Sequence, residues 1–137
     1  TSAPIRSAAE LGEFDLVVAK SLATHLLPLE LTRLLAEIGR SLSAKGTLVL
    51  TAFAFDGDAG GEVPCFPHRS RRGRVRWRLQ AHPRAAVAYD RGFLAALLRR
   101  SGLVEANFVP GFYPGTTSEL RGQDTLVVRR EALGTLR

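Results

Sequence analysis

Several residue types are missing or scarce in this chain of 137 residues, and each scarcity excludes a class of protein. The single cysteine, Cys65, excludes an internal disulfide, and with only His68 nearby it also excludes a zinc site of the usual cysteine and histidine spacing. We expect Cys65 to be a small buried apolar residue. The sequence has no run of about 18 apolar residues, the length that a membrane-spanning helix needs. The N-terminal residues also lack a basic segment followed by an apolar one, the pattern that predicts secretion, so we expect a cytoplasmic location.

Methionine is also absent and the chain opens on Thr1, which is typical of a processed protein or of a fragment of a longer one. Lysine occurs only at Lys20 and Lys45, and the other basic residues are arginines. The formal net charge is +6, and residues 63–88 hold seven arginines and no acidic residue. Because arginine is preferred along the whole chain, the basic pI alone is weak support for a nucleic-acid partner.

The first half of the chain predicts a strand, a turn, a helix and a second strand, the crossover unit of a parallel sheet. The apolar runs Phe14–Ala19 and 47–53 are typical of strands buried on both faces. Pro28 suits the first turn of a helix, and apolar residues recur at helical spacing through residues 28–42. We expect Gly46 to end this helix in left-handed backbone. The fold class predicted is therefore α/β.

The second half predicts a hairpin, a helix and two further strands. Residues 63–68 and 75–79 flank an arginine-rich turn, so we expect a β-hairpin inserted after the second strand. One face would be apolar, with Val75, Trp77 and Leu79, and the other basic and solvated, with Arg76, Arg78 and Gln80.

Asp90 is expected to cap a second helix that Gly102 closes. The third strand predicted is Leu103–Val109 and the fourth is 124–129, with a loop over 110–122 between them.

Four segments of the sequence resemble the C-terminal half of a class I S-adenosylmethionine-dependent methyltransferase. They read FDLVVAKSLATHLLP, LLAEIGRSLSAKGTLVLTAF, YDRGFLAALLRRSGL and GQDTLVV, in the order of that family's fourth strand, fourth crossover helix with fifth strand, last helix and final strands. The resemblance implies a Rossmann-like mixed sheet in which the final strand lies antiparallel between the second and third. It covers nearly the whole chain, so residues 1–137 are interpreted as a partial methyltransferase domain with an insertion at about residues 56–88.

The family's glycine-rich first loop and the acidic residue that binds the ribose hydroxyls are not found in this sequence. Residues 57–61 are rich in glycine but open no helix, which is typical of a plain loop. The resemblance therefore implies methyl transfer from S-adenosylmethionine to a small-molecule acceptor by the full-length protein. We expect this chain to lack most of the cofactor site.

Residues of the first turn are candidates for the cofactor and for catalysis. By resemblance, Ala19, Lys20, Ser21 and Leu22 fall where the family lines its cofactor pocket; the alternative is an ordinary strand-to-helix turn. His25 follows the same strand and could serve as the base that accepts a proton from a hydroxyl or amine; the alternative is packing or hydrogen bonding in the helix start.

His68, Tyr89 and Tyr113 are candidates for the acceptor pocket, with ordinary packing as the alternative. The arginine-rich hairpin has three interpretations, in order of preference: a solvated strand face, a site for an acidic or phosphate-bearing acceptor, or a nucleic-acid surface. A different class of function is a non-catalytic basic module that binds nucleic acid or a protein. The flat apolar strand Phe14–Ala19, missing its neighbour, predicts self-association through its edge.

Overall fold

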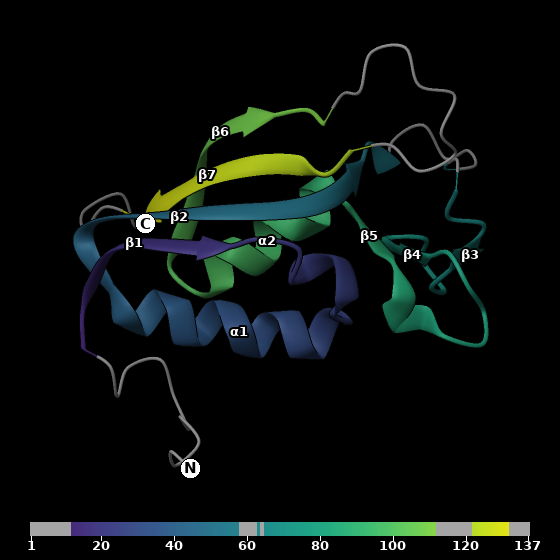
Figure 1. Cartoon of the computed structure of the whole chain (residues 1–137), viewed down its shortest axis with the longest axis horizontal. Coiled ribbons are helices and arrows are strands. Elements are labelled where there is room, and N and C mark those ends of the chain that lie inside the picture. Colours follow the sequence, from purple (N-terminus) through teal and green to yellow (C-terminus); the bar gives the residue numbers. More distant parts are fainter. Residues whose placement is uncertain (1–11, 58–62, 64, 112–121, 132–137) are drawn as a thin grey trace.

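The computed structural model describes residues 12–57, 63, 65–111 and 122–131. These residues form two α-helices and a sheet of seven strands, as the α/β class requires (Figure 1). In chain order the elements are β1 (Phe14–Ala19), η2 (Ala23–His25), α1 (Pro28–Ser41), β2 (Leu42–Phe55), β3 (His68–Arg69), β4 (Val75–Trp77), η4 (Pro83–Ala85), β5 (Val87–Asp90), α2 (Arg91–Arg100), β6 (Leu103–Val109) and β7 (Asp124–Arg130).

The sheet is mixed and is organised around the long strand β2. β7 lies antiparallel between β2 and β6, which confirms the strand order implied by the resemblance. β1 and β5 both run parallel to β2 along its other edge, β1 beside residues 47–50 and β5 beside residues 53–55. The carboxyl ends of β1, β2 and β5 therefore lie toward the same end of the molecule (Figure 1).

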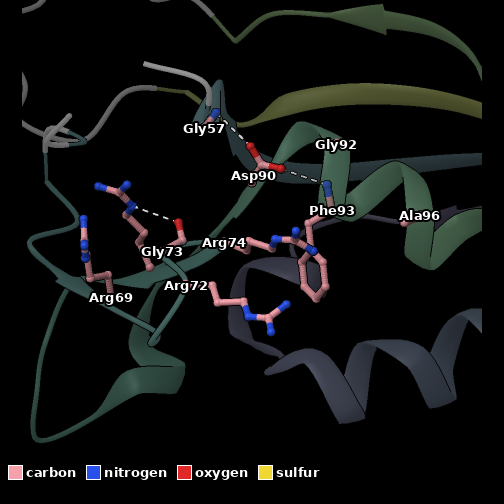
Figure 2. A pocket seen from close by; sticks show the side chains of 10 residues that line it. Gly57, Arg69, Arg72, Gly73, Arg74, Asp90, Gly92, Phe93 and Ala96 are labelled. Atoms are coloured by element: carbon pink, nitrogen blue, oxygen red, sulfur yellow. Dashed lines mark hydrogen bonds between the residues drawn. The ribbon is translucent and has the colours of Figure 1, made fainter. Parts of the chain in front are cut away.

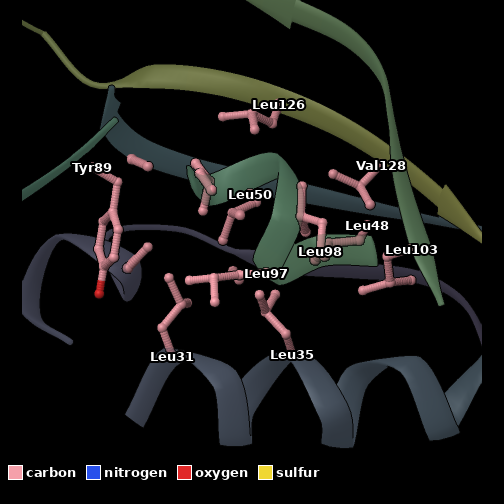
Figure 3. Packing of buried hydrophobic residues seen from close by; sticks show 14 of the residues in the cluster. Leu31, Leu35, Leu48, Leu50, Tyr89, Leu97, Leu98, Leu103, Leu126 and Val128 are labelled. Carbon is pink, nitrogen blue, oxygen red and sulfur yellow. The ribbon is translucent and has the colours of Figure 1, made fainter. Parts of the chain in front are cut away.

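The core lies between the sheet and the two helices, which cover the same face (Figure 3). Leucines of α1 and α2 meet the strand side chains there; the cluster includes Leu31, Leu35, Leu97, Leu98, Leu48, Leu50, Leu126 and Val128. No helix of the described residues is long and apolar enough to cross a membrane.

The prediction that β1 is buried on both faces is wrong for the face that points away from the helices. Side chains alternate along a strand, so Val17 and Ala19 pack toward the helices while Leu16 and Val18 point to the opposite face. Leu16 and Val18 are each 60% exposed, because none of the described residues covers them.

The helix α1 begins at Pro28 as predicted, but the predicted role of Gly46 is wrong. The helix ends at Ser41, and Gly46 lies inside β2 without the left-handed backbone expected of a helix end. A Cβ atom at Gly46 would come within 2.6 Å of the Leu42 side chain and 3.0 Å of the Phe14 carbonyl oxygen. Glycine is needed there because the Leu42 side chain, and after it the β1 backbone at Phe14, lie too close for a Cβ atom.

The prediction for α2 is confirmed at both ends. The Asp90 carboxylate accepts a hydrogen bond of 2.9 Å from the Phe93 amide, and Gly102 follows the helix with a φ of +74°. The strand Leu103–Val109 is confirmed as β6, and β7 extends one residue beyond the predicted 124–129.

The hairpin exists, but it is shorter than predicted and it belongs to the main sheet. β3 pairs antiparallel with β4, and β4 pairs antiparallel with β5, a strand that the sequence did not indicate. The prediction of a solvated basic face is wrong at Arg76. This residue is only 5% exposed, and its guanidinium lies 4.9 Å from the centre of the Phe55 ring. Leu79, expected on the apolar face, is exposed instead. Cys65 is half-buried beside Phe66, not fully buried as expected.

Candidate functional site

A cluster of three polar side chains ties the loop after β1 to the neighbouring strands. The Ser21 amide donates a 2.8 Å hydrogen bond to Thr51 Oγ1, and the Thr51 hydroxyl donates one of 2.6 Å to Gln123 Oε1. Gln123 Nε2 in turn donates to Ser21 Oγ at 3.0 Å. Sequence reasoning missed Thr51, which lies within β2, and Gln123, which immediately precedes β7.

The four residues predicted to line a cofactor pocket form this loop, and their side chains differ in exposure. Ala19 is 2% exposed and belongs to the core, so only its backbone can meet a ligand. Ser21 is half-buried and has a φ of 58°, whereas Lys20 and Leu22 reach the surface. The loop therefore offers a ligand one basic side chain, one apolar side chain and a backbone held in a fixed shape.

His25 ends the short helix η2, and its ring is oriented by a backbone group from η4. His25 Nδ1 lies 2.9 Å from the Arg84 carbonyl oxygen, and the ring is exposed. A carbonyl oxygen can only accept, so Nδ1 carries the proton in this contact. The neutral ring then keeps its lone pair on Nε2, where it can accept a proton.

The side chain of Arg84 makes a second link, to the start of α1. Arg84 Nε donates to the Glu30 carboxylate at 2.9 Å, and the other described partner of Glu30 is the Leu27 amide at 3.0 Å. The hydrogen bond from Arg84, and after it the one from Leu27, holds the pKa of Glu30 below its ordinary value. Arg84 thus connects His25 to the first turn of α1.

Of the three candidates for the acceptor pocket, the structure describes two. Tyr89 lies in the core; its hydroxyl donates a 2.6 Å hydrogen bond to the Leu26 carbonyl, and its ring stacks on Phe93. Burial raises the pKa of Tyr89, with a further contribution from the negative charge of Glu30, so the hydroxyl stays a donor. His68 is half-buried on β3, separated from the strand of Tyr89 by β4. Tyr113 lies outside the described residues.

No protein-family model and no curated protein matches this sequence. Among solved structures, the fold is similar to the mitomycin 7-O-methyltransferase MmcR, with 16% identity and a TM-score of 0.56 over 87% of this chain and 30% of that one. It is also similar to the 1,6-didemethyltoxoflavin-N1-methyltransferase of Burkholderia thailandensis, which was solved with S-adenosylhomocysteine bound. That match has 18% identity and a TM-score of 0.60, and covers 88% of this chain and 45% of that one.

A third similar structure is an S-adenosylmethionine-dependent methyltransferase from Clostridium acetobutylicum, with 10% identity and a TM-score of 0.56 over 96% of this chain and 62% of that one. These similarities show the fold of the chain, a Rossmann-like mixed sheet of the methyltransferase type. The chain spans about a third of the length of MmcR, and less than two thirds of the other two.

Proposed function

We propose that this chain is part of an enzyme that transfers a methyl group from S-adenosylmethionine to a small-molecule acceptor. The observation that carries the proposal is the hydrogen-bonded loop of residues 19–22 at the carboxyl end of β1, in a sheet with the β2–β7–β6 order. In open α/β sheets, ligands bind beyond the carboxyl ends of the strands. The names of two similar structures support a small-molecule acceptor, because they refer to mitomycin and to 1,6-didemethyltoxoflavin.

The loop would hold part of the cofactor. Its backbone is fixed at Ser21 by Thr51, and the exposed Leu22 side chain provides an apolar surface for a ring or a methylene chain. The described residues contain no glycine-rich loop that opens a helix, the element that brings backbone amides close to such a cofactor. We therefore expect the described loop to bind S-adenosylmethionine only weakly.

In the proposed reaction the chain mainly positions the reactants. S-adenosylmethionine supplies the methyl group, and its sulfur keeps the electron pair of the carbon–sulfur bond that breaks as the acceptor atom bonds to the methyl carbon. Such an in-line displacement depends on alignment in a site that excludes water. His25 Nε2 would take the proton of a hydroxyl or amine acceptor, and the contact of Nδ1 with the Arg84 carbonyl would keep Nε2 in the accepting form.

The test is a titration of S-adenosylmethionine followed by amide chemical shifts. We expect binding on the order of millimolar affinity, with shifts concentrated at residues 19–22. Leu22→Ala should weaken the binding of S-adenosylmethionine. Leu79→Ala is the control and should leave binding unchanged, because Leu79 has a similar exposure (48% against 46%) but lies outside this loop. Shifts elsewhere only, or equal effects of the two variants, would contradict the proposed site.

A further inference from the structure

A cavity of about 490 Å³ opens between the hairpin turn and the first turn of α2. Four arginines of the hairpin segment line it: Arg69, Arg72, Arg74 and Arg76. Phe93 of the helix lies on the side of Arg72 and Arg74 (Figure 2). Arg76 is the buried member, and the other three are exposed at the cavity rim. This size is typical of pockets that bind small molecules.

The cavity carries an excess of positive charge that the described residues do not balance. Its one acidic lining residue is Asp90, whose two oxygens are both engaged: Oδ1 accepts from the Gly57 amide at 2.7 Å and Oδ2 from the Phe93 amide at 2.9 Å. Within the part of the chain that the structure describes, the three exposed arginines of the rim form no ion pair. An anion entering the cavity would therefore meet three guanidinium groups that no described carboxylate holds.

The turn that presents these arginines is held in a defined shape. The Gly73 amide donates to the Ser70 carbonyl at 2.9 Å, and Gly73 has a φ of +71°, the left-handed conformation that favours glycine. The Asp90 amide donates to the Arg74 carbonyl at 2.8 Å, which fixes the turn to β5. Beneath the turn, Arg76 Nε donates to the Gly73 carbonyl at 3.2 Å. The arginine positions are thus preorganised at the level of the backbone.

We propose that this cavity binds a small organic anion, with Arg72 and Arg74 holding its phosphate or carboxylate group and Phe93 contacting its apolar body. The planar guanidinium presents paired N–H donors that match the oxygens of such groups. The Arg74 guanidinium already lies 5.9 Å from the centre of the Phe93 ring, so the charged and apolar contacts are adjacent. The cavity adjoins the carboxyl ends of β2 and β5. The loop of residues 19–22 follows the carboxyl end of β1, which is parallel to both strands. Identifying the anion with the methyl acceptor rests on the proposed function; the binding of the anion does not.

The test is calorimetric titration of the chain, without S-adenosylmethionine, using phenyl phosphate, benzoate and phenol as probes. We expect saturable binding of phenyl phosphate or benzoate, with the tighter of the two identifying the preferred group, and much weaker binding of neutral phenol. The double variant Arg72→Gln, Arg74→Gln should weaken anion binding by about tenfold or more, since each loses charge-assisted hydrogen bonds. Arg71→Gln is the matched control, because Arg71 is exposed in the same turn but does not line the cavity.

Three results would overturn the proposal. An equal loss with Arg71→Gln would indicate diffuse attraction and no defined site. Phenol binding as tightly as phenyl phosphate would indicate an apolar pocket. Salt-dependent binding of duplex DNA without binding of either anionic probe would indicate a nucleic-acid surface. Each result is independent of the titration of S-adenosylmethionine, so either proposal can fail alone.

Discussion

The Ser21 amide and the Thr51 hydroxyl form a hydrogen bond of 2.8 Å that joins the loop after β1 to the neighbouring strand β2. Ser21 has a φ of 58°, a left-handed conformation that costs a residue other than glycine about 1–2 kcal/mol. Such a conformation persists where surrounding contacts hold it, and it is often found at functional sites. The bond to Thr51, supported by Gln123, is the contact that holds it here.

Thr51→Val tests this relationship, because valine keeps the shape of threonine but removes the hydroxyl. The Ser21 amide and Gln123 then lose a partner, and we expect the free energy of unfolding to fall by about 1–3 kcal/mol. Chemical denaturation measures the change. Thr47→Val is the control on the same strand and face, where the hydroxyl makes no hydrogen bond among the described residues and the change should stay within about 0.5 kcal/mol. Equal losses from both substitutions would show that the cluster does not stabilise the loop.

The elements that the sequence predicted well are those whose signals are local. Both ends of α2 follow from single residues, Asp90 as the cap and Gly102 as the left-handed closure. The prediction for Gly46 is wrong because a glycine after a helical pattern has two common roles, and only the close packing of Leu42 and Phe14 decides between them. Arg76 was misread for a related reason: the alternation of the strand says which residues share a face, but the burial of that face depends on Phe55.

The candidate site was only partly predictable, because its partners are distant in the sequence. Ser21 lies 30 residues from Thr51 and 102 from Gln123, so no local pattern joins them. The neighbour of His25 is the backbone carbonyl of Arg84, and because every residue has such a carbonyl, the sequence does not indicate this contact. What the sequence could indicate was the strand end that carries the loop, since that follows from the alternation of strands and helices.

The ion pair between Glu30 and Arg84 predicts a dependence of stability on pH. Because the pKa of Glu30 in the folded protein is lowered from 4.5, its stabilising contribution is present above about pH 4.5 and is lost as the pH falls through the lower, folded value. The Arg84 side chain is largely exposed and that of Glu30 partly so, so the effect is small. Glu30→Gln should therefore flatten the fall in thermal stability between about pH 6 and pH 3.

Arg84→Gln should flatten the same profile, and the double variant should add little to either single change, because both remove one interaction. Glu13→Gln is the control, since it removes an exposed carboxylate just before β1 and away from Arg84. A profile for Glu30→Gln that matches both the unmodified chain and Glu13→Gln would contradict the role given to this ion pair. The pair matters for the site because the same Arg84 orients His25 through its carbonyl.

The last prediction concerns the free edge of β1. β1 pairs with β2 on one side, and among the described residues its other edge has no partner. Leu16 and Val18 add an exposed apolar surface beside that edge. An unpaired strand edge is a template for pairing with another chain, so we expect the chain to self-associate through β1. Size-exclusion chromatography with light scattering should show a mass that rises with concentration.

Val18→Lys should shift the chain toward the monomer, because a charged side chain on an edge strand opposes pairing. Val18 is a better site for this change than Val17, whose side chain packs against the core and whose replacement would also destabilise the fold. Leu79→Lys is the control, since it places the same charge on another exposed apolar residue away from β1 and should leave the association unchanged. A monomer at high concentration, with or without Val18→Lys, would mean that the edge of β1 is already covered within the chain. Association that both lysine variants weaken equally would instead point to general surface hydrophobicity as its cause.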